Sequence, residues 1–152
     1  MVMRVLGFMS GTSLDAVDMA VLDTDGEAIF AFGPAGERKL SARTRALVEQ
    51  ATLDARSWPW DAPEPASFAV AAYAVAEEHL AAAQSFLAEH GLAAADLDLV
   101  GFHGQTVWHE PPGRTRPQGR TVQLGEAAVL AQGLGLPVAF DFRTPDIRRI
   151  AS

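Results

Sequence analysis

The stretch Gly7-Phe8-Met9-Ser10-Gly11-Thr12-Ser13-Leu14-Asp15-Ala16-Val17-Asp18 decides the fold, because it joins two apolar runs through a short polar tip. Residues 2–8 lead into it and residues 17–22 lead out of it. Apolar runs of this length with turn signals between them predict paired strands. The chain is therefore expected to begin with a hairpin whose tip carries hydroxyls, a glycine and carboxylates.

This polar tip is suited to closing around a phosphate. Gly11 lets the backbone approach closely, and Asp15 or Asp18 could hold a hydrated Mg²⁺. Hydroxyl and N–H groups are offered by Ser10, Thr12 and Ser13. An ordinary polar hairpin is the alternative interpretation. A Walker loop is excluded, because no Gly-Lys-Ser/Thr follows the tip.

The composition is that of an ordinary globular domain. The chain has 152 residues, of which 49% are hydrophobic and 20% charged, enough for one domain with a core. A net charge of −7 argues against a nucleic-acid surface, which needs clustered Lys and Arg. The absence of cysteine excludes disulfides, a thiol nucleophile and a Cys-based zinc site, and fits a cytoplasmic protein. No run of 18 apolar residues predicts a membrane span, and the N-terminus is expected to be a strand rather than a signal peptide.

The first half of the chain predicts a three-stranded meander followed by helices. A third strand is expected over residues 28–32, closed by Gly33-Pro34, and short turns favour antiparallel pairing. A helix is expected from Ser41, a suitable N-cap, and a longer one over residues 66–90, stopped by Gly91. Between them, residues 57–65 form a break in which two tryptophans flank a proline. For Trp58 and Trp60 we favour packing or surface cover over ligand stacking.

The second half predicts crossover units. Strands are expected at residues 97–102, 121–124 and 137–140, with a short helix over residues 126–133. The expected fold class is α/β with a mixed sheet, a three-strand meander followed by crossover helices. This order matches one lobe of the ribonuclease-H-like fold, whose two-lobed ATPases hold phosphates on the first hairpin.

Three polar segments are expected to converge, since each follows a strand. They are residues 10–18, 103–106 and 141–143. Open α/β sheets place ligands at the carboxyl ends of their strands. A shared site at one edge of the sheet is therefore expected.

Several roles remain open for His103 and its neighbours. His103 could shuttle a proton or donate to a sugar hydroxyl, or could be a satisfied histidine at a strand end. Gly104 allows close approach, while Gln105 and Thr106 offer the donors and acceptors that a polyol needs. A metal pair of His103 with His109 is disfavoured, because no third ligand stands at a defined spacing.

The other candidate catalytic residues also have more than one possible role. A triad of Ser13, His103 and Asp141 is disfavoured, because no Gly-x-Ser-x-Gly turn is present. Asp141 could be a general base or an outer metal ligand, and Arg143 could hold a phosphate or sugar oxygen. A salt bridge between strand tip and loop is the alternative for both, and is favoured for Asp146 with Arg148 or Arg149. His79 is expected to be a partly buried or surface histidine rather than a catalytic one.

Four motifs together resemble the anhydro-N-acetylmuramic acid kinase family. The first is Met9-Ser10-Gly11-Thr12-Ser13-Leu14-Asp15 with Asp18, and the second runs from Gly101 through His103-Gly104-Gln105-Thr106-Val107-Trp108-His109-Glu110-Pro111. The third is Thr121-Val122-Gln123-Leu124-Gly125 and the fourth is Asp141-Phe142-Arg143 with Asp146. Four motifs in the right order over the whole chain make a specific match.

The resemblance implies a sugar kinase of the superfamily of actin, hexokinase and the heat-shock chaperone ATPases. Such an enzyme uses ATP and Mg²⁺ to phosphorylate the 6-oxygen of 1,6-anhydro-N-acetylmuramic acid while water opens the anhydro bridge. The product, N-acetylmuramic acid 6-phosphate, belongs to the recycling of bacterial cell-wall sugars. The resemblance assigns to ATP phosphates and Mg²⁺ the residues Gly11, Thr12, Ser13, Leu14, Asp15, Ala16, Val17 and Asp18. It assigns to the sugar His103, Gly104, Gln105, Thr106, Asp141 and Arg143.

The chain departs from the family pattern in two places. Ala16 stands where family members usually carry Gly, which crowds the loop unless the backbone there is ordinary αR or β. After Asp146 the family continues with Gly-Gly-Gln-Gly-Ala-Pro and a second lobe, whereas this chain ends at residues 147–152. Residues 1–152 are therefore expected to form a single N-terminal lobe. The catalytic base and the adenosine site would then lie in a missing half.

Two functions remain open at this point. The first is the kinase reaction of the family, with little or no activity expected of the 152-residue chain alone. The second is an inactive lobe that binds sugar or phosphate, or that pairs with a separately encoded second lobe. An uncovered half of an interdomain cleft would also favour self-association, for example as a homodimer.

Overall fold

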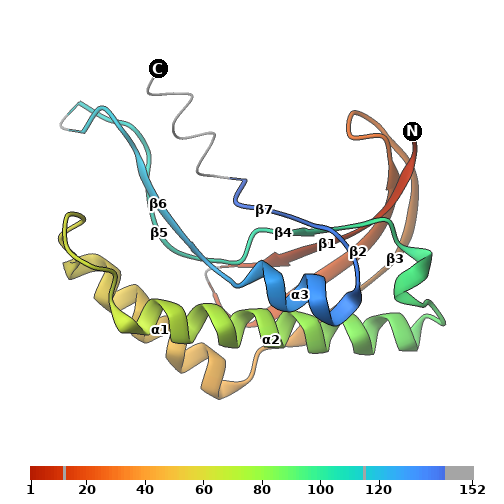
Figure 1. Cartoon of the computed structure of the whole chain (residues 1–152), viewed down its shortest axis with the longest axis horizontal. Coiled ribbons are helices and arrows are strands. Elements are labelled where there is room, and N and C mark those ends of the chain that lie inside the picture. The colour runs from red at the N-terminus through yellow and green to blue at the C-terminus, as the bar shows by residue number, and fades with distance from the viewer. Residues whose placement is uncertain (12, 115, 143–152) are drawn as a thin grey trace.

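The computed structural model describes residues 1–11, 13–114 and 116–142. In these residues the three helices lie on one side of the two sheets (Figure 1). The strands are β1 (Met3–Ser10), β2 (Ala16–Thr24), β3 (Ile29–Lys39), β4 (Leu99–Phe102), β5 (Gln105–Glu110), β6 (Arg120–Leu124) and β7 (Val138–Phe140). The helices are α1 (Ala42–Ser57), α2 (Ala66–Glu89) and α3 (Ala127–Leu134), with a 3₁₀ turn at Ala94–Asp96.

The main sheet is mixed, as expected. Within the described residues it has five strands in the order β3-β2-β1-β4-β7. β1 pairs antiparallel with β2, and β2 with β3, which confirms the predicted meander. β4 pairs parallel with both β1 and β7. The ends of β1, β4 and β7 therefore lie at the same edge of the sheet, as the sequence predicted for their polar tips.

The predicted end of the third strand was wrong. β3 runs on through Gly33 and Pro34 to Lys39 instead of closing at Phe32. The register with β2 shifts between Ala20 and Leu22, and a Cβ at position 33 would lie 3.1 Å from Val21. Glycine therefore fits this bulge. Proline is tolerated beside it because β3 is an edge strand, which needs no ladder hydrogen bond on its outer side.

Alternation along the strands places the core on one face of the sheet. Leu6, Phe8, Val17 and Val100 are buried towards the helices, where they meet the apolar stripe of α2. On the other face Met9 is 64% exposed. The helices thus bury Leu6, Phe8 and Ser10 of β1, and the odd-numbered positions between them stay more accessible.

The helix boundaries agree closely with the sequence. Ser41 caps α1, since its side-chain oxygen accepts from the Thr44 N–H at 3.2 Å. α2 ends before Gly91, whose φ of +64° is the left-handed conformation typical of a helix stop. No helix in the described part of the chain is long and apolar enough to cross a membrane.

The strand predicted over residues 121–124 is confirmed as β6, but its partner strand β5 was not predicted. Residues 105 and 106 were part of a predicted polar segment, but residues 105–110 pair antiparallel with β6 in a separate hairpin that leaves the main sheet (Figure 1). Gly104 and Gly125 form the crossing point. A Cβ on Gly104 would lie 2.4 Å from the Leu124 carbonyl oxygen, and a Cβ on Gly125 would lie 2.4 Å from the Phe102 ring. Glycine at both positions permits this close backbone packing.

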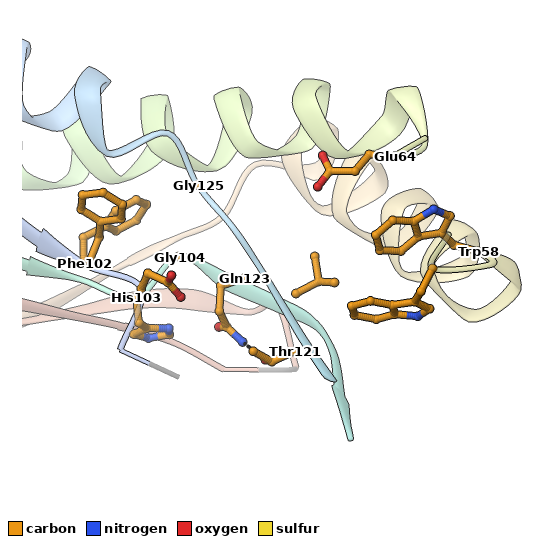
Figure 2. Close-up of a pocket in the computed structure, with 12 residues that line it drawn as sticks. Trp58, Glu64, Phe102, His103, Gly104, Thr121, Gln123 and Gly125 are labelled. Carbon is orange, nitrogen blue, oxygen red and sulfur yellow. Dashed lines mark hydrogen bonds between the residues drawn. The ribbon is translucent and has the colours of Figure 1, made fainter. Parts of the chain in front are cut away.

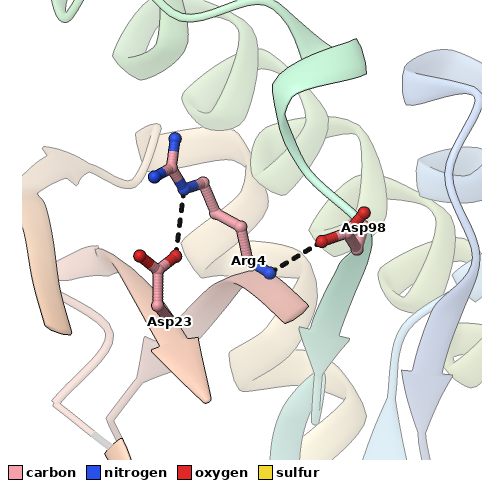
Figure 3. A network of polar contacts seen from close by, with 3 residues as sticks. All are labelled: Arg4, Asp23 and Asp98. Atoms are coloured by element: carbon pink, nitrogen blue, oxygen red, sulfur yellow. Dashed lines mark hydrogen bonds and ion pairs between the residues drawn. The ribbon is translucent and has the colours of Figure 1, made fainter. Parts of the chain in front are cut away.

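Polar contacts fix the register at the opposite end of the sheet. The Arg4 N–H donates to the Asp98 carboxylate at 2.8 Å, and the Asp98 N–H donates to the Arg4 carbonyl at 2.8 Å (Figure 3). The Arg4 guanidinium also pairs with Asp23 at 3.0 Å. These bonds connect β1 to the entry of β4 and to β2, which aligns the polar tips at the far ends of the strands.

Candidate functional site

The tip of the first hairpin is held in a defined shape. The Leu14 N–H donates to the Gly11 carbonyl at 3.2 Å, and the Leu40 N–H donates to the Asp15 carbonyl at 3.1 Å. Leu14 has a φ of +56°, and its buried side chain anchors this strained conformation in the core. Ala16 begins β2 opposite Lys39, in ordinary extended backbone, so its methyl group meets no conformational penalty. Thr12 lies outside the described residues.

Two hydrogen bonds connect this tip to the segment after β4. The Ser10 hydroxyl donates to the Gly104 carbonyl at 3.2 Å, and both groups are buried. The Gln105 side-chain amide donates to the Gly11 carbonyl at 3.1 Å, and Gln105 is only 2% exposed. Two of the three predicted polar segments are thus bonded directly to each other. Because a buried amide must find partners, Gln105 gives the tip a fixed position against β5.

The third polar segment meets the second in a cavity of about 330 Å³. Figure 2 shows His103, Thr121 and Gln123 in its middle, between Phe102 at one end and Trp58 and Glu64 at the other. Asp141, which follows β7 with a φ of +58°, lines the same cavity. The complete lining is Trp58, Trp60, Glu64, Phe102, His103, Gly104, Thr121, Val122, Gln123, Gly125, Phe140 and Asp141. Arg143 and Asp146 fall outside the described residues.

The predicted sugar residues divide between two cavities. Gln105 and Thr106 line a second space of about 370 Å³, where β5 faces Leu14 and α1. Thr106 still acts on the first cavity, because its hydroxyl donates to the Gln123 side-chain oxygen at 2.6 Å. The Gln123 amide in turn donates to the Thr121 hydroxyl at 2.8 Å. This chain of bonds orients the polar wall of the first cavity.

Several lining residues were not selected from the sequence. Gln123 and Thr121 stood in a recognised motif, but nothing marked them as facing a cavity until β5 and β6 were known to pair. Trp58 and Trp60 were expected to be packing or surface cover. They stack on each other at 4.6 Å between ring centroids, and both line the cavity. Glu64 had no sequence signal, since its position depends on the path of the connection between α1 and α2.

The two candidate Mg²⁺ carboxylates lie on opposite sides of the hairpin. Asp15 lies near α1, where its carboxylate is 3.7 Å from the Arg45 guanidinium. Asp18 alternates with buried Val17 and Met19, so it faces the other side of the sheet. In the part of the chain that is described, no cluster of three or more His, Asp or Glu side chains is placed to hold a metal ion. The donors present therefore fit a hydrated ion held through water by one carboxylate, in the way that Mg²⁺ often binds.

His79 lies behind the site and is fully buried, rather than partly buried or at the surface as expected. Its ring packs edge-on against Phe8 at 5.1 Å and Phe102 at 4.9 Å, and Nδ1 bonds to the Val75 carbonyl at 2.7 Å. Burial lowers the pKa of His79 to about 4, with a further lowering from the nearby His103. The imidazole is therefore neutral at pH 7, with Nδ1 as the protonated nitrogen and Nε2 carrying the lone pair.

Comparison with known proteins identifies the family. A family model for anhydro-N-acetylmuramic acid kinase matches residues 3–149. The chain belongs to the anhydro-N-acetylmuramic acid kinase family. It is 63% identical over 145 residues to an anhydro-N-acetylmuramic acid kinase of Phenylobacterium zucineum, and 62% identical over 145 residues to one of Caulobacter vibrioides. Each alignment covers 95% of this chain and 39% of the relative.

More distant members of the anhydro-N-acetylmuramic acid kinase family match in the same way. A relative from Rhodopseudomonas palustris strain BisB18 is 45% identical over 145 residues, which is 95% of this chain and 38% of that protein. The chain thus spans about two fifths of the length of the curated relatives that it matches. The site described above lies entirely within the matched part.

Proposed function

We propose that this chain supplies the phosphate loop and part of the sugar site of a kinase that phosphorylates 1,6-anhydro-N-acetylmuramic acid. ATP is the phosphoryl donor, the 6-oxygen of the sugar is the acceptor, and water opens the anhydro bridge to give N-acetylmuramic acid 6-phosphate. Membership of the family, together with the fold, supports this reaction. Because its ATP is a cytoplasmic metabolite, the reaction would take place in the cytoplasm, in recycling of cell-wall sugars.

The sheet order supports a fold of the ribonuclease-H-like, actin-like ATPase class. A three-strand meander is followed by two strands parallel to β1, and the first hairpin lies beside the carboxyl ends of β4 and β7. In this proposal residues 1–152 form one lobe, and the relatives' remaining length supplies a second. The 152-residue chain by itself is then expected to show little or no turnover, because the family's water-activating carboxylate is not among the matched motifs.

In this proposal the tip of the first hairpin binds the phosphates of ATP, mainly through its backbone. Amide and hydroxyl groups of residues 11–13 would donate hydrogen bonds to phosphate oxygens. Asp15 or Asp18 would hold Mg²⁺ through water. When bound, Mg²⁺ neutralises charge on the phosphates, which is the main requirement of phosphoryl transfer. The protein's own contribution is to keep the loop in place, through Gln105 and Leu14.

On the sugar side, the cavity provides a polar wall and apolar ends. His103, Thr121 and Gln123 offer donors and acceptors to hydroxyl and amide groups of the sugar. Gly104 lets the ring approach the backbone, while Asp141 and Arg143 are assigned to the sugar by family resemblance. Gln105 and Thr106 would act indirectly. Gln105 orients Gly11, and Thr106 orients the side chain of Gln123.

The observation that carries the proposal is the direct bonding between the two halves of the site. Ser10 bonds to Gly104, and Gln105 bonds to Gly11, so the phosphate loop and the sugar segment are held within hydrogen-bond distance. Phosphoryl transfer depends on fixing donor and acceptor next to each other. A buried, doubly bonded junction between loop and cavity supplies that rigidity.

Amide NMR on the 152-residue chain tests the proposal. Addition of ATP with Mg²⁺ should shift the amide signals of Gly11, Ser13 and Asp15, and inorganic triphosphate should shift the same signals, because the phosphates make the contact. The anhydro sugar should shift His103 and Gln123 instead. The exposed turn at residues 24–28 serves as an internal reference that neither ligand moves. Shifts confined to that turn, or no shifts at millimolar ligand, would contradict the proposal.

A further inference from the structure

Trp58 and Trp60 line the end of the sugar cavity opposite Phe102, and they form a three-membered stack with Arg120 (Figure 2). Trp58 is anchored by its indole N–H, which donates to the Ala62 carbonyl at 3.1 Å, and by edge contact with Phe68 at 5.4 Å. Trp60 stacks on Trp58, and the Arg120 guanidinium carbon lies over the Trp60 ring at 4.8 Å from its centroid. The connection between α1 and α2 is thereby joined to β6 across the cavity.

Within the described residues, the guanidinium of Arg120 is stacked on Trp60 rather than paired with a carboxylate. Its cross-strand neighbour in the hairpin is Glu110, but the Glu110 carboxylate is engaged by Arg116 at 3.5 Å. Across the described residues 1–11, 13–114 and 116–142, no carboxylate forms an ion pair with Arg120. A guanidinium that is half-buried on an aromatic face loses little conformational entropy when it binds a planar anion. Arg120 is not itself among the residues that line the cavity, but it is held next to them, since Trp60 beneath it and the adjacent Thr121 both line it.

We infer that Arg120, positioned by Trp60, is a specificity-determining residue that binds a carboxylate carried by the sugar substrate. This inference rests on the proposed function, in which the substrate is an N-acetyl sugar with an acidic ether substituent. The sugar ring occupies the polar wall formed by His103 and Gln123, and its carboxylate extends towards the Trp60 end. Arg120 then discriminates acidic from neutral N-acetyl sugars, because a guanidinium and a carboxylate form charge-assisted, two-point hydrogen bonds.

Glu64 provides an opposing element at the same end of the cavity. Its carboxylate lines the cavity beside the two tryptophans, so it repels an incoming anion (Figure 2). Replacing it therefore has the opposite sign from replacing Arg120. A pair of substitutions with opposite effects on one ligand, and no effect on the neutral ligand, is a signature that general damage to the fold does not produce.

The test is isothermal titration of the 152-residue chain with two probes, 1,6-anhydro-N-acetylmuramic acid and 1,6-anhydro-N-acetylglucosamine. They differ in the carboxylate-bearing ether. The wild-type chain should bind the acidic sugar about tenfold more tightly or better. Arg120→Gln should remove that preference while leaving the neutral sugar unchanged, and Arg120→Lys should retain part of it. Glu64→Gln should strengthen the preference.

Arg114→Gln is the matched control, since it removes an exposed cation from the same β5–β6 connection and should change neither affinity. An Arg120→Gln chain that keeps the full preference, or that loses affinity for both sugars equally, overturns the inference and leaves the sugar kinase proposal standing. If neither sugar binds to the wild-type chain, the sugar-site assignment itself is refuted, and the role of Arg120 with it.

Discussion

The burial of His79 predicts a loss of stability in mildly acidic solution. In the unfolded chain an ordinary histidine takes up a proton near pH 6.5, whereas burial lowers the pKa of native His79 to about 4. Between these values the unfolded state binds more protons than the native state. Stability is therefore fully present above pH 6.5 and is lost as the pH falls towards 4.

The size of this effect follows from the two pKa values. Linkage gives a loss of about 1.4 kcal/mol in the free energy of unfolding between pH 8 and pH 5.5, rising to about 3 kcal/mol by pH 4. For a chain of this length, the loss at pH 5.5 lowers the melting temperature by roughly 3–6 °C. Measurements at pH 5.5 and above keep the titration of carboxylates such as Glu78, whose pKa is lowered, out of the comparison.

Thermal and urea unfolding of three chains at pH 8, 7, 6 and 5.5 provides the assay. The wild-type chain should lose stability as the pH falls over this range. The His79→Leu chain should not, because leucine fills the same apolar space between Phe8 and Phe102 and does not titrate. His109→Gln removes an exposed histidine and should keep the wild-type slope. If His79→Leu retains the full pH dependence, another group is responsible and the burial argument is refuted.

Three further substitutions test the junction and the helices. Gly104→Ala should lower the free energy of unfolding in urea by at least about 2 kcal/mol, because the new Cβ would lie 2.4 Å from the Leu124 carbonyl oxygen at a φ of +73°. A loss of less than half of that would show that the hairpin shifts easily to make room. Gln105→Leu should cost about 1–3 kcal/mol and speed hydrogen exchange in the loop after β1, since the Gly11 carbonyl loses its partner. Unchanged exchange there would mean that the loop is held by other contacts. Ser41→Ala should cost about 1 kcal/mol through loss of the α1 cap, and a urea midpoint equal to wild type would count against that cap.

Periodicity and turn chemistry were sufficient for most of the fold. The hairpin of β1 and β2, the Ser41 cap and the long α2 each depend on local patterns of a few residues, which are legible without tertiary information. The continuation of β3 through Gly33-Pro34 was missed because it depends on being an edge strand. Edge position is a property of the sheet rather than of the local sequence.

The second hairpin shows where local reasoning fails. Residues 105–110 alternate between buried and accessible positions only because β6 lies beside them and α1 lies beneath. Without that pairing, His103 to Thr106 appear as one polar cluster. In the structure the pairing divides them, with His103 and Gly104 on the cavity beside Trp58 and Gln105 and Thr106 on the cavity next to α1.

Only part of the candidate site could be predicted from the sequence, because its other residues are brought together by tertiary packing. Residues that follow β1, β4 and β7 could be grouped because parallel strands end at one edge of a sheet. Trp58, Trp60 and Glu64 come from the connection between two helices, and their approach to Thr121 and Gln123 depends on how α1, α2 and β6 pack together. The spacing of these residues along the sequence gives no sign that they lie close together in the fold.

The central claim is that the loop after β1 and the segment after β4 serve one phosphoryl transfer. The most direct measurement uses a chimera in which the matched residues of this chain replace those of the Phenylobacterium zucineum relative, with the parent protein as positive control. The chimera is incubated with ATP, Mg²⁺ and 1,6-anhydro-N-acetylmuramic acid in ¹⁸O-labelled water, and the product is analysed by mass spectrometry. The account predicts an ATP-dependent, phosphorylated and ring-opened sugar that carries one heavy oxygen. A folded chimera that forms no such product, while the parent protein does, would contradict it.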